Sequence, residues 1–328
     1  MENNINRRQF IATATKAGIS IAAASAAAYL LYDKKGPPAK PKAHDLVTFP
    51  DYSVPKITGQ TISIVKGDDR TKSVDKAIDL LGGIERFVKP GDNVIIKPNA
   101  AFATSPALAA TTNPQLIARV VRLCYDRGQA AKVYVTDNPI NDPASCFTLS
   151  GIAKAATAAG AKLILPKENL FRNTTLAGAK LIKNWPVLYK PFEKADKLIA
   201  IAPVKDHHRS GASMTMKNFY GLLGGRRNIF HQDIHTIIAE LSMMIKPTLV
   251  ILDGTVSMIS NGPTGGSFDD LKNTNTLIAS CDMVAADSFG AQLLDLKVSD
   301  LPYLEKAQNA GVGTTDYNSL KPKFATVT

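Results

Sequence analysis

Short apolar segments alternate with amphipathic segments of helical length along most of this 328-residue chain. The apolar segments are rich in β-branched residues and are bounded by turn residues, which is typical of buried strands. We expect strands at residues 61–65, 93–97, 132–136, 161–165, 197–202, 248–252 and 275–280. We expect helices at residues 73–88, 113–127, 150–159 and 282–294. This alternation predicts an α/β fold with a largely parallel β-sheet flanked by helices.

Ligands of such sheets bind beyond the carboxyl ends of the strands. The residues that follow the expected strands are therefore the first place to look for a functional site. They are Lys97-Pro98-Asn99, Asp137-Asn138, Lys205 to His208, Asp253-Gly254 and Cys281-Asp282.

The first 32 residues carry the pattern of an export signal. Arg7 and Arg8 are followed by a polar residue and two apolar ones, and an uncharged, Ala-rich run extends from Ala17 to Tyr32. This pattern resembles a twin-arginine signal, so we expect export by the twin-arginine translocase. The uncharged run is shorter than the roughly 20 residues of a membrane span, so cleavage and retention as a membrane anchor both fit. The expected location is the periplasm or the outer face of the cytoplasmic membrane.

The next segment, residues 33–56, is rich in proline and lysine and is expected to be a linker. Residues 57–328 then form the α/β domain. The formal net charge of the chain is +11, and part of the excess lies in the N-terminal 43 residues. A basic chain suits a small anionic ligand or an anionic membrane surface.

Two classes of partner are not expected. No basic run with interleaved aromatic residues occurs, which argues against nucleic acid. The three cysteines are far apart and form no CxxC pair, so no iron–sulfur cluster is expected.

Four of the five histidines lie between Lys205 and Glu240. His231 and His235 have the i, i+4 spacing by which a helix presents two metal ligands, although structural histidines at a helix boundary are the alternative. His207 and His208 follow a strand, so we expect them, together with Lys217, to serve in acid/base catalysis.

Several further residues are candidates for holding an anion. Arg226 and Arg227 follow two glycines and could clamp a carboxylate or phosphate, with Arg226 as the named candidate, and the loop from Asn261 to Gly266 could present backbone N–H groups to an anion. A solvated side chain or turn is the alternative in each case. The expected anion-binding residues are Lys97, Asn99, Asn218, Arg226, Asp253, Asn261, Gly262 and Thr264.

An ordered set of motifs resembles the family catalogued as domain of unknown function 362. The set comprises Lys97-Pro98-Asn99, residues 217–222, His231 and His235, Asp253-Gly254 with Asn261-Gly262-Pro263, and Asp282 with Asp287. Members of that family are often fused to iron–sulfur modules, but this chain lacks the cysteines. The family is also distantly similar to nickel-dependent lactate racemase-type proteins, which implies a metal ion or metal cofactor.

The hypothesis that follows is an exported metal- or metal-cofactor-dependent enzyme acting on a small anionic substrate. One alternative is an exported protein that binds an anion without catalysis. Another is an assembly or scaffold factor with structural histidines.

Overall fold

The computed structural model describes residues 46–328, together with residues 7–8, 11–12, 14–16, 18–20, 22 and 25. The chain divides into two units, Met1–Lys42 and Ala43–Thr328, of which the second contains the folded domain. The described residues of the first unit are helical. The rest of the signal-like segment, and the expected linker as far as residue 45, lie outside the described residues. Among the residues that are described, no helix is both long enough and apolar enough to cross a membrane.

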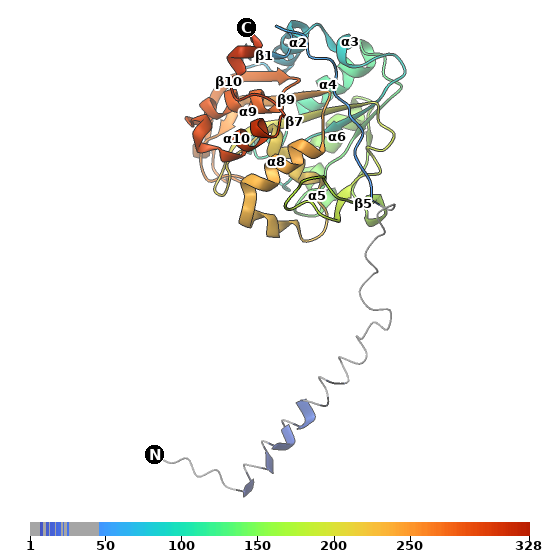
Figure 1. Ribbon diagram of the computed structural model, residues 1–328, viewed down its shortest axis with the longest axis vertical. Coiled ribbons are helices and arrows are strands. Elements are labelled where there is room, and N and C mark those ends of the chain that lie inside the picture. The colour runs from blue at the N-terminus through green and yellow to red at the C-terminus, as the bar shows by residue number, and fades with distance from the viewer. Residues whose placement is uncertain are drawn as a thin grey trace. The chain divides into compact units, whose positions relative to one another are not determined.

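A mixed, mostly parallel sheet of nine strands forms the centre of the second unit (Figure 1). The strands follow the order β11-β1-β10-β9-β7-β2-β3-β4, and β8 pairs with β7. Their bounds are β1 (Ile62–Lys66), β2 (Asn93–Lys97), β3 (Lys132–Val135), β4 (Lys162–Leu163), β7 (Lys197–His207), β8 (Gly211–Ser213), β9 (Leu249–Met258), β10 (Leu271–Ser280) and β11 (Lys323–Thr326). The run β9-β7-β2-β3-β4 is parallel throughout, whereas β10 is antiparallel to both of its neighbours. A separate antiparallel pair is formed by β5 (Phe171–Thr174) and β6 (Trp185–Leu188).

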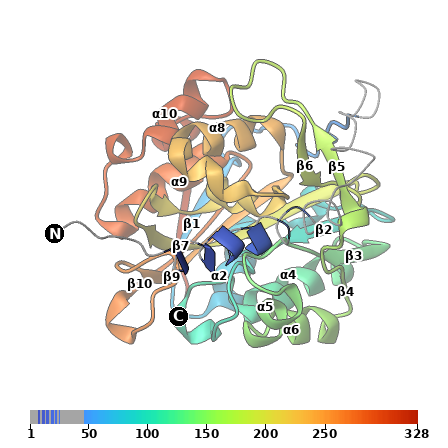
Figure 2. The same cartoon turned by 90° about the horizontal axis from the view of Figure 1, so that it is seen from below.

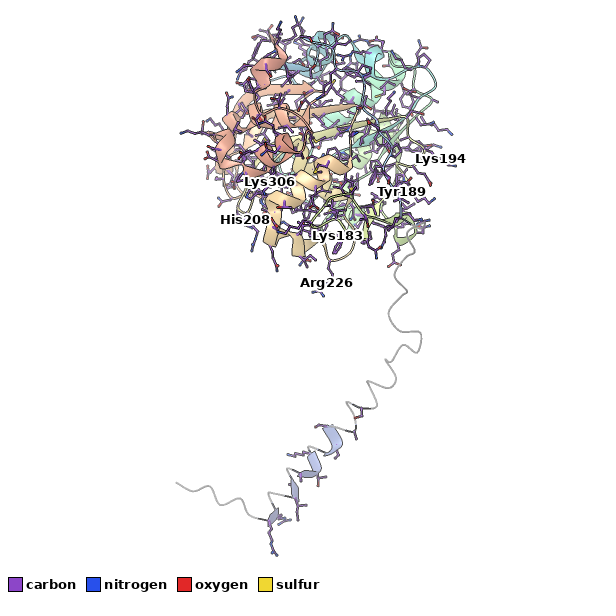
Figure 3. The ribbon with its side chains drawn as sticks, viewed as in Figure 1. Lys183, Tyr189, Lys194, His208, Arg226 and Lys306 are labelled. Atoms are coloured by element: carbon purple, nitrogen blue, oxygen red, sulfur yellow. The ribbon has the colours of Figure 1, made fainter. Side chains whose placement is uncertain are left out.

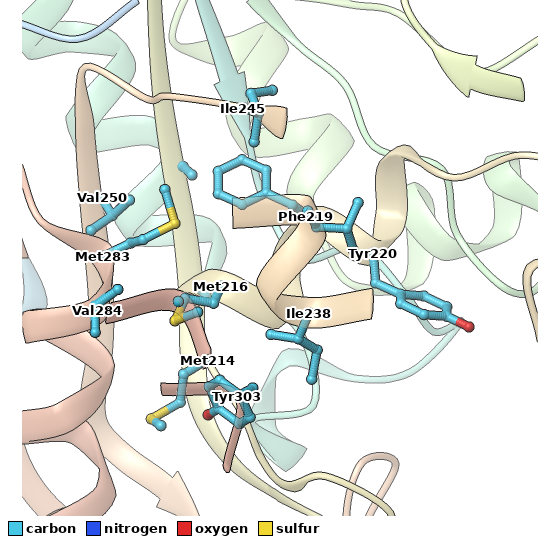
Figure 4. Packing of buried hydrophobic residues seen from close by; sticks show 14 of the residues in the cluster. Met214, Met216, Phe219, Tyr220, Ile238, Ile245, Val250, Met283, Val284 and Tyr303 are labelled. Carbon is cyan, nitrogen blue, oxygen red and sulfur yellow. The ribbon is translucent and has the colours of Figure 1, made fainter. Parts of the chain in front are cut away.

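Helices cover both faces of this sheet (Figure 2). One face carries α2 (Arg70–Leu80), α3 (Ile84–Phe87), α4 (Pro114–Asp126), α5 (Pro143–Leu149) and α6 (Ile152–Ala158). The other carries α7 (Thr215–Asn218), α8 (Ile234–Met244), α9 (Met283–Ala291) and α10 (Pro302–Asn309). Each face has its own hydrophobic core, and Figure 4 shows methionines and Phe219 packed together in one of them. The expected α/β architecture is therefore confirmed.

Several elements differ from expectation. The strand expected at residues 197–202 continues as β7 to His207, so Lys205 and His207 lie within the strand instead of after it. The strand expected at residues 248–252 continues to Met258, because pairing with β7 on one side and β10 on the other extends the ladder. Asp253 consequently lies within β9 instead of at its end. The single helix expected at residues 73–88 is divided into α2 and α3, because Gly82 and Gly83 adopt φ values of 103° and 81°.

Part of the expected linker belongs to the folded domain. Tyr52 is 2% exposed, and its hydroxyl donates a hydrogen bond to the carbonyl of Phe192 at 2.7 Å. The Thr248 hydroxyl donates to the carbonyl of Tyr52, also at 2.7 Å. The compact unit thus begins earlier than residue 57, because the apolar rings of Phe49 and Tyr52 are buried in spite of the neighbouring prolines.

One buried carboxylate fixes a loop against α8. Glu240 is 5% exposed, and its carboxylate accepts hydrogen bonds from three consecutive backbone amides, those of Lys180 (2.6 Å), Leu181 (3.1 Å) and Ile182 (2.9 Å). Charge-assisted bonds of this kind offset the cost of burying the carboxylate.

We expect Glu240→Leu to destabilise the protein by roughly 3–5 kcal/mol, because it leaves the buried amides without an acceptor. Glu240→Gln keeps an acceptor oxygen and should cost about 1–2 kcal/mol. Urea unfolding measures both effects, and the exposed Glu305→Gln on α10 serves as the control. Equal stability of all three variants would contradict the structural role of Glu240.

Candidate functional site

A cavity of about 500 Å³ opens where the carboxyl ends of β2, β3 and β7 meet α7. Its lining includes six of the residues singled out from the sequence. They are Asn99, His207, His208, Lys217, Asn218 and His231. The lining also includes Asp137, Lys205, Tyr220 and Arg227, which come from strand ends and from the segment after α7.

The short helix α7 is held in place from beneath. Asp287 on α9 is fully buried, and its carboxylate accepts hydrogen bonds from the backbone amides of Thr215 (2.9 Å) and Met216 (3.0 Å) and from the Thr215 hydroxyl (2.5 Å). Burial raises the pKa of Asp287 to about 7, although these donors act in the opposite direction. Asp287 thereby fixes the start of the helix that carries Lys217.

Lys217 is buried at the cavity wall, and none of the described residues is its counter-ion. It is 8% exposed, and its Nζ lies 5.0 Å from the centre of the Tyr220 ring. Within the described part of the chain it has no hydrogen-bond acceptor and no ion-pair partner. Burial, followed by the charge of Arg227, lowers the pKa of Lys217 to about 7. The amine is therefore close to half-protonated at neutral pH.

Lys205 is the second lysine of the cavity, and it is anchored. Its Nζ donates a hydrogen bond to the carbonyl of Ala110 at 2.6 Å and lies 5.0 Å from the centre of the Phe102 ring. Burial, followed by the charge of Lys217, lowers its pKa to about 7 as well.

Lys97 lies behind the cavity wall and organises it. Its Nζ is 2.7 Å from Oδ1 of Asp137 and donates hydrogen bonds to Oδ1 of Asn218 (2.9 Å) and to the carbonyl of Pro98 (3.0 Å). These three contacts engage all three of its N–H groups, so Lys97 positions other residues instead of contacting a ligand. A Cβ added at Gly221 would lie 2.2 Å from Oδ1 of Asp137, so the glycine is required for this close packing.

Of the two adjacent arginines considered as an anion clamp, Arg227 lines the cavity and the named candidate Arg226 does not. Arg226 is exposed and projects from the surface (Figure 3), whereas Arg227 is 8% exposed and lines the cavity. The 3-10 helix that begins at Arg227 turns this side chain inward. Its guanidinium donates hydrogen bonds to the carbonyls of Asn138 (2.8 Å) and Pro139 (2.7 Å).

The histidines of the cavity have defined proton positions. Nδ1 of His207 accepts hydrogen bonds from the backbone amides of Arg209 (3.2 Å) and Ser210 (3.3 Å), so its ring proton is on Nε2. Burial, followed by the charge of Lys217, lowers the pKa of His207 to about 2, and the ring is neutral. Neutral His207 is therefore a hydrogen-bond donor through Nε2.

His231 has the opposite tautomer. The Tyr220 hydroxyl donates its proton to the carbonyl of Arg227, so Nδ1 of His231 must donate to the Tyr220 oxygen (3.0 Å), and it also points at the carbonyl of Asn228 (3.3 Å). This leaves a free lone pair on Nε2. Burial and Lys217 lower the pKa of His231, which keeps the ring neutral. In Figure 4 the Tyr220 ring extends away from the buried methionines, carrying its hydroxyl at the outer end.

The structure does not bring His235 to the cavity. Its ring stacks on that of Tyr303 at 6.1 Å between centroids, and its buried Nδ1 has no hydrogen-bond partner in the part of the chain that the structure describes. His231 lies in a 3-10 helix and His235 in α8, so the two are not presented by one regular helix. Instead His207 stacks with His208 (5.1 Å) and with His231 (5.9 Å). No group of three or more His, Cys, Asp or Glu side chains is arranged to hold a metal ion among the described residues.

Three other expected anion-binding residues lie apart from the cavity lining. Asp253 pairs with Arg70 at 2.8 Å, within β9. Asn261 donates a hydrogen bond to Asp270 at 2.6 Å, and Thr264 is exposed.

The loop that carries Asn261 and Thr264 reaches the cavity through Pro263. Gly262 supports it from behind, with its amide donating to Oδ2 of Asp206 at 2.9 Å. A Cβ at Gly262 would lie 1.9 Å from the carbonyl oxygen of Asp206. The glycine is therefore needed for close packing here.

Sequence reasoning did not assign roles to three residues of the site, Asp137, Lys205 and Tyr220. The sequence did indicate where Asp137 and Lys205 lie. Asp137 follows the apolar strand β3, and Lys205 lies near the carboxyl end of the apolar strand β7. Tyr220 carried no such signal, because it lies in an irregular 3-10 segment whose inward side depends on tertiary packing.

The chain is similar in sequence to one curated protein and, at lower identity, to solved structures. It is 27% identical over 252 residues to the thylakoid-associated protein sll1697 of Synechocystis sp., covering 74% of this chain and 75% of that protein. The lactate racemase apoprotein from Thermoanaerobacterium thermosaccharolyticum is similar with a TM-score of 0.37 and 12% identity, covering 74% of this chain and 58% of that one. A protein from Thermotoga maritima is similar with a TM-score of 0.35 and 11% identity, covering 75% of this chain and 60% of that one. This chain spans less than two thirds of either solved structure.

The family model described as Domain of unknown function (DUF362) matches residues 94–292. The matched range contains every residue that lines the cavity. The chain belongs to the domain of unknown function 362 family.

Proposed function

We propose that this protein is an enzyme that binds a small anionic substrate in the cavity and transfers a proton to or from it. The excess of buried positive charge carries this proposal. Lys205, Lys217 and Arg227 line the cavity, whereas Asp137 is the only carboxylate among the lining residues and already pairs with Lys97. Buried cations without counter-ions are costly, and a bound anion supplies the missing charge.

The tautomers of the histidines favour proton transfer. His231 presents an unprotonated Nε2 and suits the role of a general base, while His207 presents an N–H that can donate to a substrate oxygen. Lys217, with a pKa of about 7, can gain or lose a proton near neutral pH. A base, a donor and a titrating cation thus border one cavity.

The second candidate is a form of the same enzyme that depends on a metal-containing cofactor. Nδ1 of His208 lies 3.3 Å from the carbonyl of Gly262, as Nδ1 of His231 lies near that of Asn228. A proton on Nδ1 that is directed at this carbonyl leaves the lone pair of His208 on Nε2. Metal-binding histidines are commonly oriented by such a contact. An all-protein metal site does not fit the described residues, so a cofactor would have to bring its other ligands. Such a metal centre would supply Lewis-acid chemistry.

We further propose that the protein is exported through the twin-arginine route and acts in the periplasm or at the outer face of the cytoplasmic membrane. The adjacent arginines and the uncharged, Ala-rich run that follows them support this proposal.

Anion affinity is expected to fall as the pH rises from about 6 to about 8, because Lys217 and Lys205 lose their charges through a pKa of about 7. Isothermal titration with malonate measures this dependence. Lys217→Met should weaken binding ~10-fold at about pH 6 and flatten the pH profile. The exposed Lys183→Met is the matched control. Affinity that is independent of pH in the unaltered protein would sink the proposal.

Catalysis is expected to depend on His231 but not on His235. The assay uses NMR to follow deuterium uptake from heavy water at the carbon next to the carboxylate of short 2-hydroxy acids, and at the carbon next to the ketone, on the side away from the carboxylate, of short 2-oxo acids. His231→Asn should lower the exchange rate by roughly 100-fold while malonate still binds. His235→Asn should leave the exchange rate unchanged. If instead His231→Asn and His235→Asn both lose exchange together with a stoichiometric metal, the metal pair expected from the sequence is correct.

The export proposal predicts that replacing Arg7 and Arg8 by lysines keeps the protein in the cytoplasm. Lysine preserves the charge, so loss of export would show that the paired arginines are read specifically. Cell fractionation of the full chain measures the distribution, and Lys16→Arg is the control. Unchanged export of the double variant would rule the twin-arginine route out.

A further inference from the structure

Among the residues that the structure describes, three lysines are buried around this site, and only one of them has an amine without a hydrogen-bond or ion-pair partner. Nζ of Lys97 contacts Asp137, Asn218 and Pro98, and Nζ of Lys205 is hydrogen-bonded to Ala110. Nζ of Lys217 has only the face of the Tyr220 ring beside it among the described residues. Buried polar groups are nearly always paired, so an unpaired amine at a cavity wall requires an explanation.

We propose that Lys217 forms a covalent imine with the substrate, and that the substrate class is short 2-oxo acids. This inference rests on the proposed function, because it uses the same cavity and the same anion. A 2-oxo acid carries a ketone next to its carboxylate. The cationic groups of Arg227 and Lys205 attract the carboxylate, while the ketone carbon meets the free amine of Lys217.

The surroundings of Lys217 favour its neutral, nucleophilic form. Burial and the neighbouring Arg227 lower its pKa to about 7, so about half of the molecules carry a free amine at neutral pH. An ordinary lysine has on the order of one neutral amine in a thousand there. Desolvation and a nearby cation are the two means by which proteins activate lysine nucleophiles.

The step balances without any other reactant. The neutral amine attacks the ketone carbon, the C–N bond forms, and one of the two amine protons passes to the ketone oxygen, which becomes a hydroxyl. The nitrogen then loses its remaining proton, the C–O bond breaks, and the oxygen leaves as water. Nε2 of His231 can accept the proton from nitrogen and return it to the leaving hydroxyl. The products are one imine and one water molecule, with no change in oxidation state.

Borohydride trapping tests the inference on the full-length protein. Pyruvate and cyanoborohydride are added at neutral pH, and peptide mass spectrometry locates the reduced adduct. We expect labelling of Lys217 at least ~10-fold above that of the exposed Lys183, because far more of its amine is neutral. Malonate, which carries carboxylates but no ketone, should compete with the labelling.

Lys217→Arg separates this inference from the proposed function. Arginine keeps the positive charge but cannot form the imine, so malonate should still bind and the adduct should be lost. If the unaltered protein binds malonate but Lys217 is labelled no faster than Lys183, the imine is overturned and the anion site stands. If the unaltered protein neither binds malonate nor labels at Lys217, both proposals fail.

Discussion

The buried ion pair between Lys97 and Asp137 is the interaction on which the site depends. Lys97 ends β2, Asp137 follows β3, and Asn218, which completes the contact, ends α7. One ammonium group thus joins two neighbouring strand ends to the helix that carries Lys217. In a low-dielectric interior such a pair is stable only with its remaining hydrogen bonds satisfied, and here the carbonyl of Pro98 and Oδ1 of Asn218 accept the other two hydrogen bonds of the ammonium group. Gly221 permits the close approach by having no side chain.

Around this neutralised pair the remaining cations are unbalanced. Lys205 and Lys217 are each partly deprotonated near neutral pH, because the pKa of each is lowered to about 7. Arg227 keeps its charge and donates hydrogen bonds to backbone carbonyls. The cavity therefore favours both the binding of an anion and the transfer of a proton. The same physical cause, burial of cations without counter-ions, underlies the expected anion affinity and the reactivity assigned to Lys217.

The local sequence determined much of the fold and part of the site. Strand β2 occupies the expected residues 93–97, and α4 begins at the expected Asn113-Pro114 cap, because β-branched runs and capping residues act over a few positions. The helix expected at residues 73–88 was extended past the end of α2 at Leu80. The sequence shows the two glycines that follow α2, but it does not show the positive φ values with which they end the helix.

The histidine and arginine assignments show where local reasoning ends. His231 and His235 have metal-ligand spacing, yet a change from 3-10 to α-helix between them directs only His231 to the cavity. Arg226 and Arg227 are equivalent as sequence, and the packing of one 3-10 turn decides which of them is buried.

The sequence by itself determined the α/β architecture and the segments from which the site is drawn, because strand and helix patterns are local and strand ends meet at one edge of the sheet. Tertiary structure alone decided which cations are paired and which nitrogen of each histidine is free. Those properties arise from burial and from contacts between residues far apart in the chain.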